Sequence, residues 1–202
     1  MIPELGHFAL ILALLLAIAQ TFYGLAGPAR GNVTWMRTAR SAAVGQWTFT
    51  LLAFLALVWS FVEKDFSVQY VAGNANAELP LLFRITATWG GHEGSLLLWA
   101  FILSCWTMAV TVLPGAMPLP FHTRVLGVLG VVSVGFLLFV LSTSSPFTRL
   151  LPIPLDGRDL NPLLQDVALG LHPPGLYVGY VGFSVAFAFA CAALIEGRTD
   201  VA

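Results

Sequence analysis

The chain has 202 residues, of which 58% are hydrophobic and only 9% carry a charged side chain. A soluble domain normally carries about a quarter charged residues, so this composition excludes an ordinary soluble fold and indicates an all-α protein embedded in a lipid bilayer. The formal net charge of −1 gives no sign of a surface that binds nucleic acid.

Five apolar stretches are each long enough to cross a bilayer, which takes about 20 helical residues. They predict a polytopic membrane protein with a single membrane domain over residues 1–202. The predicted spans are 5–26, 42–62, 95–113, 124–142 and 175–195. The first stretch follows Met-Ile-Pro-Glu, which lacks the basic region of a signal peptide, so we expect it to remain as a membrane helix.

The connection after the first span carries three arginines, Arg30, Arg37 and Arg40, and no acid. Positively charged connections stay on the cytoplasmic side of a membrane. This predicts an outward-facing N-terminus and two long outer loops, 63–94 and 143–174. No span has a carboxylate or lysine at mid-membrane depth, where ion and proton transporters usually carry one, so a transporter is not expected.

The first outer loop ends in a glycine-rich turn around His92. The pair His92-Glu93 begins the zinc motif H-E-x-x-H, but residue 96 is leucine, so a zinc protease is excluded. Glycines allow backbone to approach a neighbour closely. We expect the turn to serve the packing of the helix that follows, with ligand contact as the alternative.

The second outer loop ends at His172, directly before two prolines. Asn161-Pro162 predicts an N-cap, with a short helix over 163–169 closed by Gly170. The prolines restrict the backbone, and the positive end of a helix starting at 175 favours the neutral imidazole that ligates iron. His172 is therefore a candidate axial ligand of haem iron at the water–lipid boundary, with an interfacial capping histidine as the alternative.

Three arginines of the outer loops, Arg84, Arg149 and Arg158, are candidates to contact the propionate groups of a haem. A guanidinium binds a carboxylate through two parallel hydrogen bonds. The alternative is a salt bridge to an acid of the second outer loop. That alternative is favoured for Arg158, which stands between Asp156 and Asp159.

Three long strings in this order resemble the CcmF family, the haem-lyase subunit of the cytochrome c maturation pathway. They are Trp-Gly-Gly-His-Glu-Gly-Ser-Leu-Leu-Leu-Trp (89–99), Asp-Gly-Arg-Asp-Leu-Asn-Pro-Leu-Leu-Gln-Asp (156–166) and Leu-His-Pro-Pro-Gly-Leu-Tyr-Val-Gly-Tyr-Val-Gly-Phe (171–183). The resemblance extends over nearly the whole chain. A member of the related NrfE type, from nitrite-reductase maturation, is also compatible with these strings.

The resemblance implies a multi-pass protein of the bacterial inner membrane with a periplasmic N-terminus. Such a protein accepts haem b from a periplasmic chaperone of the CcmE type, beside subunits of the CcmH type. It helps to attach this haem to the CxxCH thiols of apocytochrome c, and His172 matches one of the family's axial ligands. The family is several times longer, so we expect this chain to carry only its first section and not to complete haem attachment alone.

Two alternatives belong to other functional classes. A non-catalytic membrane scaffold would recruit the haem chaperone or the carriers of apocytochrome, and it predicts that His172 is dispensable. A subunit of a quinol-using respiratory enzyme needs at least two histidines that face each other inside the bilayer, and the predicted spans offer none at that depth.

Overall fold

The computed structural model describes residues 1–197, which form seven α-helices and one 3-10 helix without a strand. The elements are α1 Ile2–Ala29, α2 Val33–Val62, α3 Gln69–Asn74, α4 Leu81–Ala87, α5 His92–Val112, α6 Leu119–Thr143, η1 Pro162–Leu164 and α7 Val167–Glu196. Five of these helices, α1, α2, α5, α6 and α7, are long and apolar enough to cross a membrane. Each predicted span falls on one of them, which confirms the all-α polytopic fold.

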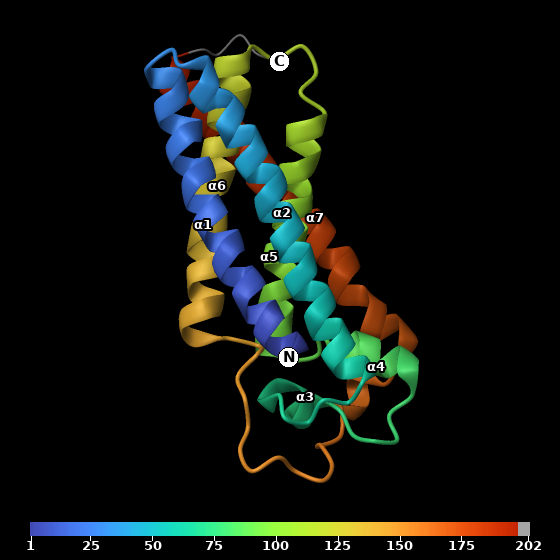
Figure 1. Cartoon of the computed structure of the whole chain (residues 1–202). Helices are drawn as coiled ribbons and strands as arrows, with labels where there is room; N and C mark the ends of the chain where they lie inside the picture. The colour runs from blue at the N-terminus through green and yellow to red at the C-terminus, as the bar shows by residue number, and fades with distance from the viewer. Residues whose placement is uncertain (198–202) are drawn as a thin grey trace.

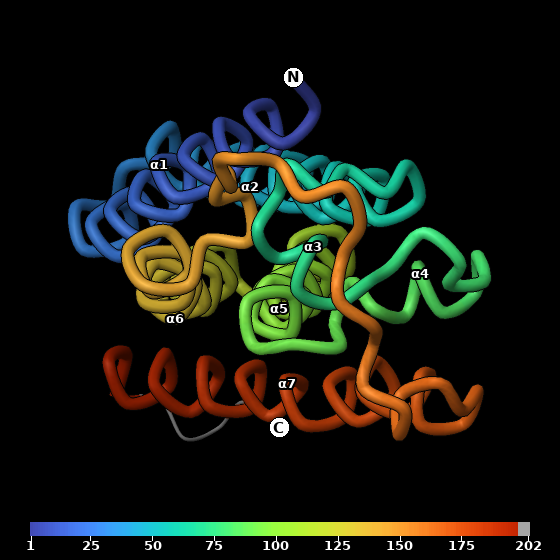
Figure 2. Tube along the Cα trace, turned by 90° about the horizontal axis from the view of Figure 1, so that it is seen from below, coloured from blue at the N-terminus to red at the C-terminus, as the bar shows by residue number. Residues whose placement is uncertain are grey.

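The five long helices run roughly along one axis (Figure 1). In the view along that axis, α1 and α2 lie on one face, α7 lies on the opposite face, and α5 and α6 lie between them (Figure 2). The N-terminus, α3, α4 and residues 144–166 gather at one end of the bundle, which we name the loop end (Figure 1). Both predicted outer loops therefore share an end with the N-terminus.

Small residues allow the long helices to approach closely. A Cβ on Gly24 of α1 would lie 2.5 Å from the Cα of Gly127 in α6, so the two backbones touch there. Nearby, the buried side chain of Gln20 donates to the backbone carbonyl of Leu126 at 2.7 Å. Small residues and a buried interhelical hydrogen bond are the usual means of holding helices together in lipid.

The two outer loops pair with each other at the loop end. The Gln69 N–H donates to the Thr148 carbonyl at 2.9 Å, and the Leu150 N–H donates to the Ser67 carbonyl at 2.8 Å. These bonds surround a single antiparallel bridge between the two loops. At the same end, α4, η1 and α7 pack against one another.

Candidate functional site

His172 lies inside α7 rather than in front of a helix. The helix begins at Val167, where Asp166 is the N-cap and its carboxylate accepts the Leu169 N–H at 3.0 Å. The predicted start at residue 175 is therefore wrong, because a strong cap starts the helix two turns earlier. His172 is the sixth residue of the helix and lies beyond its first turn, where a helix dipole mainly acts.

The short helix that precedes α7 is also shorter than predicted. Asn161 is the expected N-cap, and its side chain accepts the Leu163 N–H at 3.1 Å. It starts only the 3-10 helix η1, and Gly170 lies inside α7 instead of closing a helix over 163–169. The prediction of that short helix was wrong because the Asp166 cap divides the segment.

The two prolines that follow His172 remove backbone donors from α7. In a regular helix the N–H groups at positions 173 and 174 would bind the carbonyls of Leu169 and Gly170, but proline has no N–H. The indole Nε1–H of Trp89 donates to the Gly170 carbonyl at 2.8 Å. This bond takes the place of the one that position 174 would have made, and it joins the ends of the two outer loops.

The imidazole of His172 is exposed, and among residues 1–197 no hydrogen-bond partner contacts its ring. Leu169 and Leu176 lie one turn to either side on the same face and are 47% and 53% exposed. An unengaged imidazole nitrogen beside apolar side chains suits a flat apolar macrocycle with a central iron. The residues around His172 therefore fit a haem.

His92 is the first residue of α5 and differs in its surroundings. Its Nε2 lies 3.1 Å from the Ser144 hydroxyl oxygen. Its ring also packs edge-on against Phe139 of α6, with the two ring centroids 6.4 Å apart. These contacts agree with a turn that serves packing.

Tyr70 of α3 organises the glycine-rich turn before α5, and sequence reasoning missed it. Its hydroxyl accepts the Gly91 N–H at 2.9 Å and donates to the Thr88 carbonyl at 3.2 Å. Burial raises the pKa of Tyr70. A Cβ on Gly94 would overlap the Thr88 carbonyl oxygen, so this position requires glycine.

Arg84 lies on α4, which packs against α7 at the loop end. Its Nε donates to the Leu79 carbonyl at 2.8 Å, and its Nη1 donates to the Val62 carbonyl at 2.8 Å. The guanidinium is thereby anchored to the backbone of α2 and of the segment that precedes α4.

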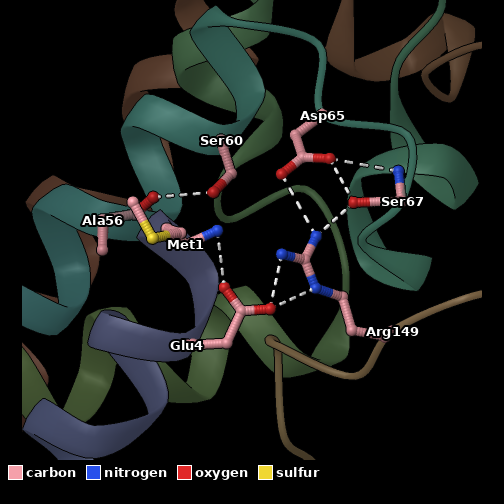
Figure 3. Close-up of polar contacts among 7 residues, drawn as sticks. All are labelled: Met1, Glu4, Ala56, Ser60, Asp65, Ser67 and Arg149. Carbon is pink, nitrogen blue, oxygen red and sulfur yellow. Dashed lines mark hydrogen bonds and ion pairs between the residues drawn. The ribbon is translucent and has the colours of Figure 1, made fainter.

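Arg149 lies in an ion-pair cluster between two carboxylates (Figure 3). Its Nε donates to Glu4 Oε1 at 2.7 Å, and its Nη1 lies 3.2 Å from Asp65 Oδ2. Neither acid belongs to the second outer loop, so the alternative of a salt bridge within that loop is wrong for Arg149. Glu4 belongs to α1, on the face of the bundle opposite α7 (Figure 2), so the structure does not bring Arg149 to His172.

Arg158 lines a polar cleft of about 690 Å³ between α3 and the second outer loop. Within residues 1–197 it makes no salt bridge, so the expected pairing with the flanking acids was wrong. Asp156 instead accepts the Ala77 N–H at 2.8 Å, and Asp159 accepts from the Asn76 side chain. No residue of α7 lines this cleft, which is therefore separate from the surroundings of His172.

No group of three or more His, Cys, Asp or Glu side chains gathers in the part of the chain that the structure describes. Cys105 and Cys191 are free thiols inside α5 and α7.

Comparison with known proteins identifies the kind of protein that carries these motifs. Residues 89–200 match the family described as Cytochrome C assembly protein. The cytochrome c-type biogenesis protein CcmF of Pseudomonas aeruginosa PAO1 is 60% identical over 203 residues, covering 100% of this chain and 31% of that protein. CcmF of Escherichia coli K12 is 54% identical over 201 residues, with 99% and 31% covered.

A relative of the NrfE type is also similar. The NrfE protein of Haemophilus influenzae is 44% identical over 199 residues, covering 98% of this chain and 31% of that protein. A solved structure titled Cytochrome c Heme Lyase CcmF superposes with a TM-score of 0.84 at 27% identity, over 98% of this chain and 31% of that one. The expected resemblance is confirmed, and the chain spans about 31% of the length of these relatives.

Proposed function

Because the chain belongs to the cytochrome c assembly protein family, we propose that it is the haem-receiving section of a cytochrome c haem lyase. Its five apolar helices and its bacterial relatives identify a multi-pass protein of the bacterial inner membrane. In this proposal it accepts haem b from a chaperone of the CcmE type. It then helps to present that haem to the CxxCH motif of apocytochrome c, with a CcmH-type subunit as a further partner.

The observation that carries the proposal is the placement of His172. The side chain stands exposed on the second turn of α7, at the loop end, beside exposed leucines. A neutral imidazole is the form that ligates haem iron. We propose His172 as one axial ligand, with the second supplied from outside this chain.

The task of this chain is binding and orientation. Haem itself supplies the reactive vinyl groups, each of which takes up one cysteine S–H to form a thioether. If the protein holds the macrocycle at a defined place in the membrane surface, the protein, the haem and the apocytochrome need not all meet at once. The apocytochrome then has to meet only the protein with its bound haem. Because the chain is about 31% of the length of its relatives, we expect it to need the remainder for the whole reaction.

The three outer-loop arginines remain proposed contacts for the propionates. Arg84 is the best supported, since α4 packs against α7. Arg149 would have to leave Glu4 and Asp65, and Arg158 would have to reach out of its separate cleft.

The proposed orientation places the loop end in the periplasm. The turn between α1 and α2 lies at the opposite end of the bundle from the N-terminus (Figure 1). It leads into Arg30, Arg37 and Arg40, and such basic connections stay in the cytoplasm. This supports a periplasmic N-terminus and a periplasmic His172.

The experiment is an absorption spectrum with haem staining. The full chain is co-expressed with the haem chaperone and the remaining part of a relative, then purified in detergent as wild type, His172→Ala and the matched control His92→Ala. We expect His172→Ala to lose the chaperone-delivered haem and the mature cytochrome c, and His92→Ala to retain both. Unchanged haem and unchanged maturation in His172→Ala would contradict the proposal and favour a non-catalytic scaffold.

A further inference from the structure

We propose that Trp89 is a positioning residue for His172. Its indole N–H takes the place of the backbone N–H that Pro174 lacks, and it thereby holds the first two turns of α7 in the helical form that presents the imidazole. The inference rests on the proposed function, because it assumes that His172 is presented to haem iron.

The start of α7 needs an external donor. Pro173 and Pro174 occupy the seventh and eighth positions of the helix, where two consecutive intrahelical bonds are lost. The residue before a proline is also disfavoured in the helical region, and that residue is His172. The segment that carries the imidazole is therefore the least self-supporting part of α7.

Trp89 is suited to supply that donor because it is fixed from two sides. Its ring stacks on Phe54 of α2, with centroids 6.4 Å apart and planes 14° apart. Its backbone carbonyl accepts the Ser95 hydroxyl at 2.8 Å. The indole N–H is thus aimed at the Gly170 carbonyl at 2.8 Å before any ligand is present.

The close approach of α7 to the segment that carries Trp89 is built into the chain. A Cβ on Gly170 would lie 3.1 Å from the Thr86 methyl carbon, which is tighter than ordinary packing. Glycine at position 170 therefore lets the carbonyl reach the indole.

A second tryptophan provides an internal comparison. Trp106 of α5 donates its indole N–H to the Val178 carbonyl of α7 at 3.0 Å. Val178 lies in a regular part of the helix, where the Gly182 N–H can serve the same carbonyl. If the Trp106 donor is removed, the Val178 carbonyl keeps a partner within the helix. If the Trp89 donor is removed, the Gly170 carbonyl loses its partner.

The test measures hydrogen exchange of the full chain in lipid nanodiscs, in the peptides that cover residues 167–176. We expect Trp89→Phe, which keeps an aromatic ring but removes the N–H, to speed exchange there about tenfold, the factor for one lost hydrogen bond. Pro174→Ala restores a backbone N–H, so the double variant Trp89→Phe with Pro174→Ala should return to within about twofold of wild type. Trp106→Phe should leave these peptides unchanged.

The same variants are titrated with ferric haem and followed by the absorption signature of the axial histidine. We expect Trp89→Phe to weaken this absorption signature toward that of His172→Ala. The double variant should recover the signature of wild type. Wild-type exchange in Trp89→Phe, or a double variant that exchanges as fast as Trp89→Phe, would overturn the role of the indole.

The two readouts separate this inference from the proposed function. If His172→Ala binds haem as wild type does, the proposed function fails, and positioning for haem fails with it. If His172→Ala loses haem while Trp89→Phe changes exchange but not haem binding, only the positioning role is overturned.

Discussion

The two histidine-bearing turns at the loop end differ in what surrounds them. Each follows a stretch with glycine or proline and lies in the first two turns of a long helix. Both side chains are exposed, but the His92 ring contacts Ser144 and Phe139, whereas the His172 ring has no hydrogen-bond partner within residues 1–197. One histidine is therefore held by its neighbours, and the other makes no ring hydrogen bond in the described part of the chain that a ligand would have to displace.

The position of each helix in the bundle explains this difference. Half of the most apolar window of α5 is buried inside the bundle, whereas the value for α7 is 17%. α5 has neighbours on several sides, and α7 lies at one face (Figure 2). A histidine at the start of a central helix meets partners, and one at the start of a peripheral helix does not.

The largest effect is expected from the glycines of the two turns. Gly94→Ala places a methyl group on the Thr88 carbonyl, and because backbone must move, we expect a loss of about 3 kcal/mol in the free energy of unfolding. Gly175→Ala, in the other turn, meets nothing within 4 Å and should be neutral or stabilising by less than about 1 kcal/mol. Denaturant titration in detergent, followed by circular dichroism, compares the two. Equal unfolding midpoints for the two variants would mean that position 94 accepts a methyl group as readily as position 175 does.

The next effect concerns the hydroxyl that organises the first turn. Tyr70→Phe leaves the Gly91 N–H and the Thr88 carbonyl without their partner, so we expect a loss of about 2 kcal/mol. Tyr180→Phe is the control, since its side chain is 66% exposed, and it should change stability by less than about 0.5 kcal/mol.

The same hydroxyl predicts a dependence on pH. Burial raises the pKa of Tyr70 above its ordinary value of 10.0. Its contribution to stability is therefore fully present below pH 10 and is lost as the pH rises through the folded-state pKa. A Tyr70→Phe protein with the same alkaline unfolding profile as wild type would contradict this prediction.

A smaller effect is expected from the histidines themselves. His92→Ala removes one partly buried hydrogen bond and should cost about 1 kcal/mol, whereas His172→Ala should cost less than about 0.5 kcal/mol. A double-mutant cycle of His92→Ala with Ser144→Ala measures the bond directly. Strict additivity in that cycle would mean that the bond between His92 and Ser144 does not stabilise the protein and does not explain the difference between the two histidines.

The smallest effect is expected from the arginines around the turns. Arg149→Gln breaks the ion pairs with Glu4 and Asp65, but Glu4 is 56% exposed, so we expect a loss below about 1 kcal/mol that shrinks in high salt. Arg158→Gln, with no such pair, should show neither the loss nor the salt dependence. Unfolding midpoints at low and high ionic strength test both, and a salt-independent loss for Arg149→Gln would point to packing instead of charge.

Several contacts at the loop end could not have been read from sequence. The Trp89 indole and the Gly170 carbonyl are 81 residues apart, and Arg149 and Glu4 are 145 residues apart. Local patterns describe neighbours in the chain, so sequence reasoning placed the partners of the arginines in the same loop. The start of α7 was missed although Asp166 is a local N-cap, because two consecutive prolines normally argue against a helix at positions 173 and 174.

By itself, the sequence determined the membrane class, the five long helices, the family motifs and the candidacy of His172. These depend on the length of apolar runs and on local strings of residues, both of which are properties of contiguous chain. Only the tertiary structure decided which histidine is engaged and that Arg149 and Arg158 lie away from α7. Those outcomes depend on backbone donors and acceptors brought together from distant segments, and no local pattern encodes them.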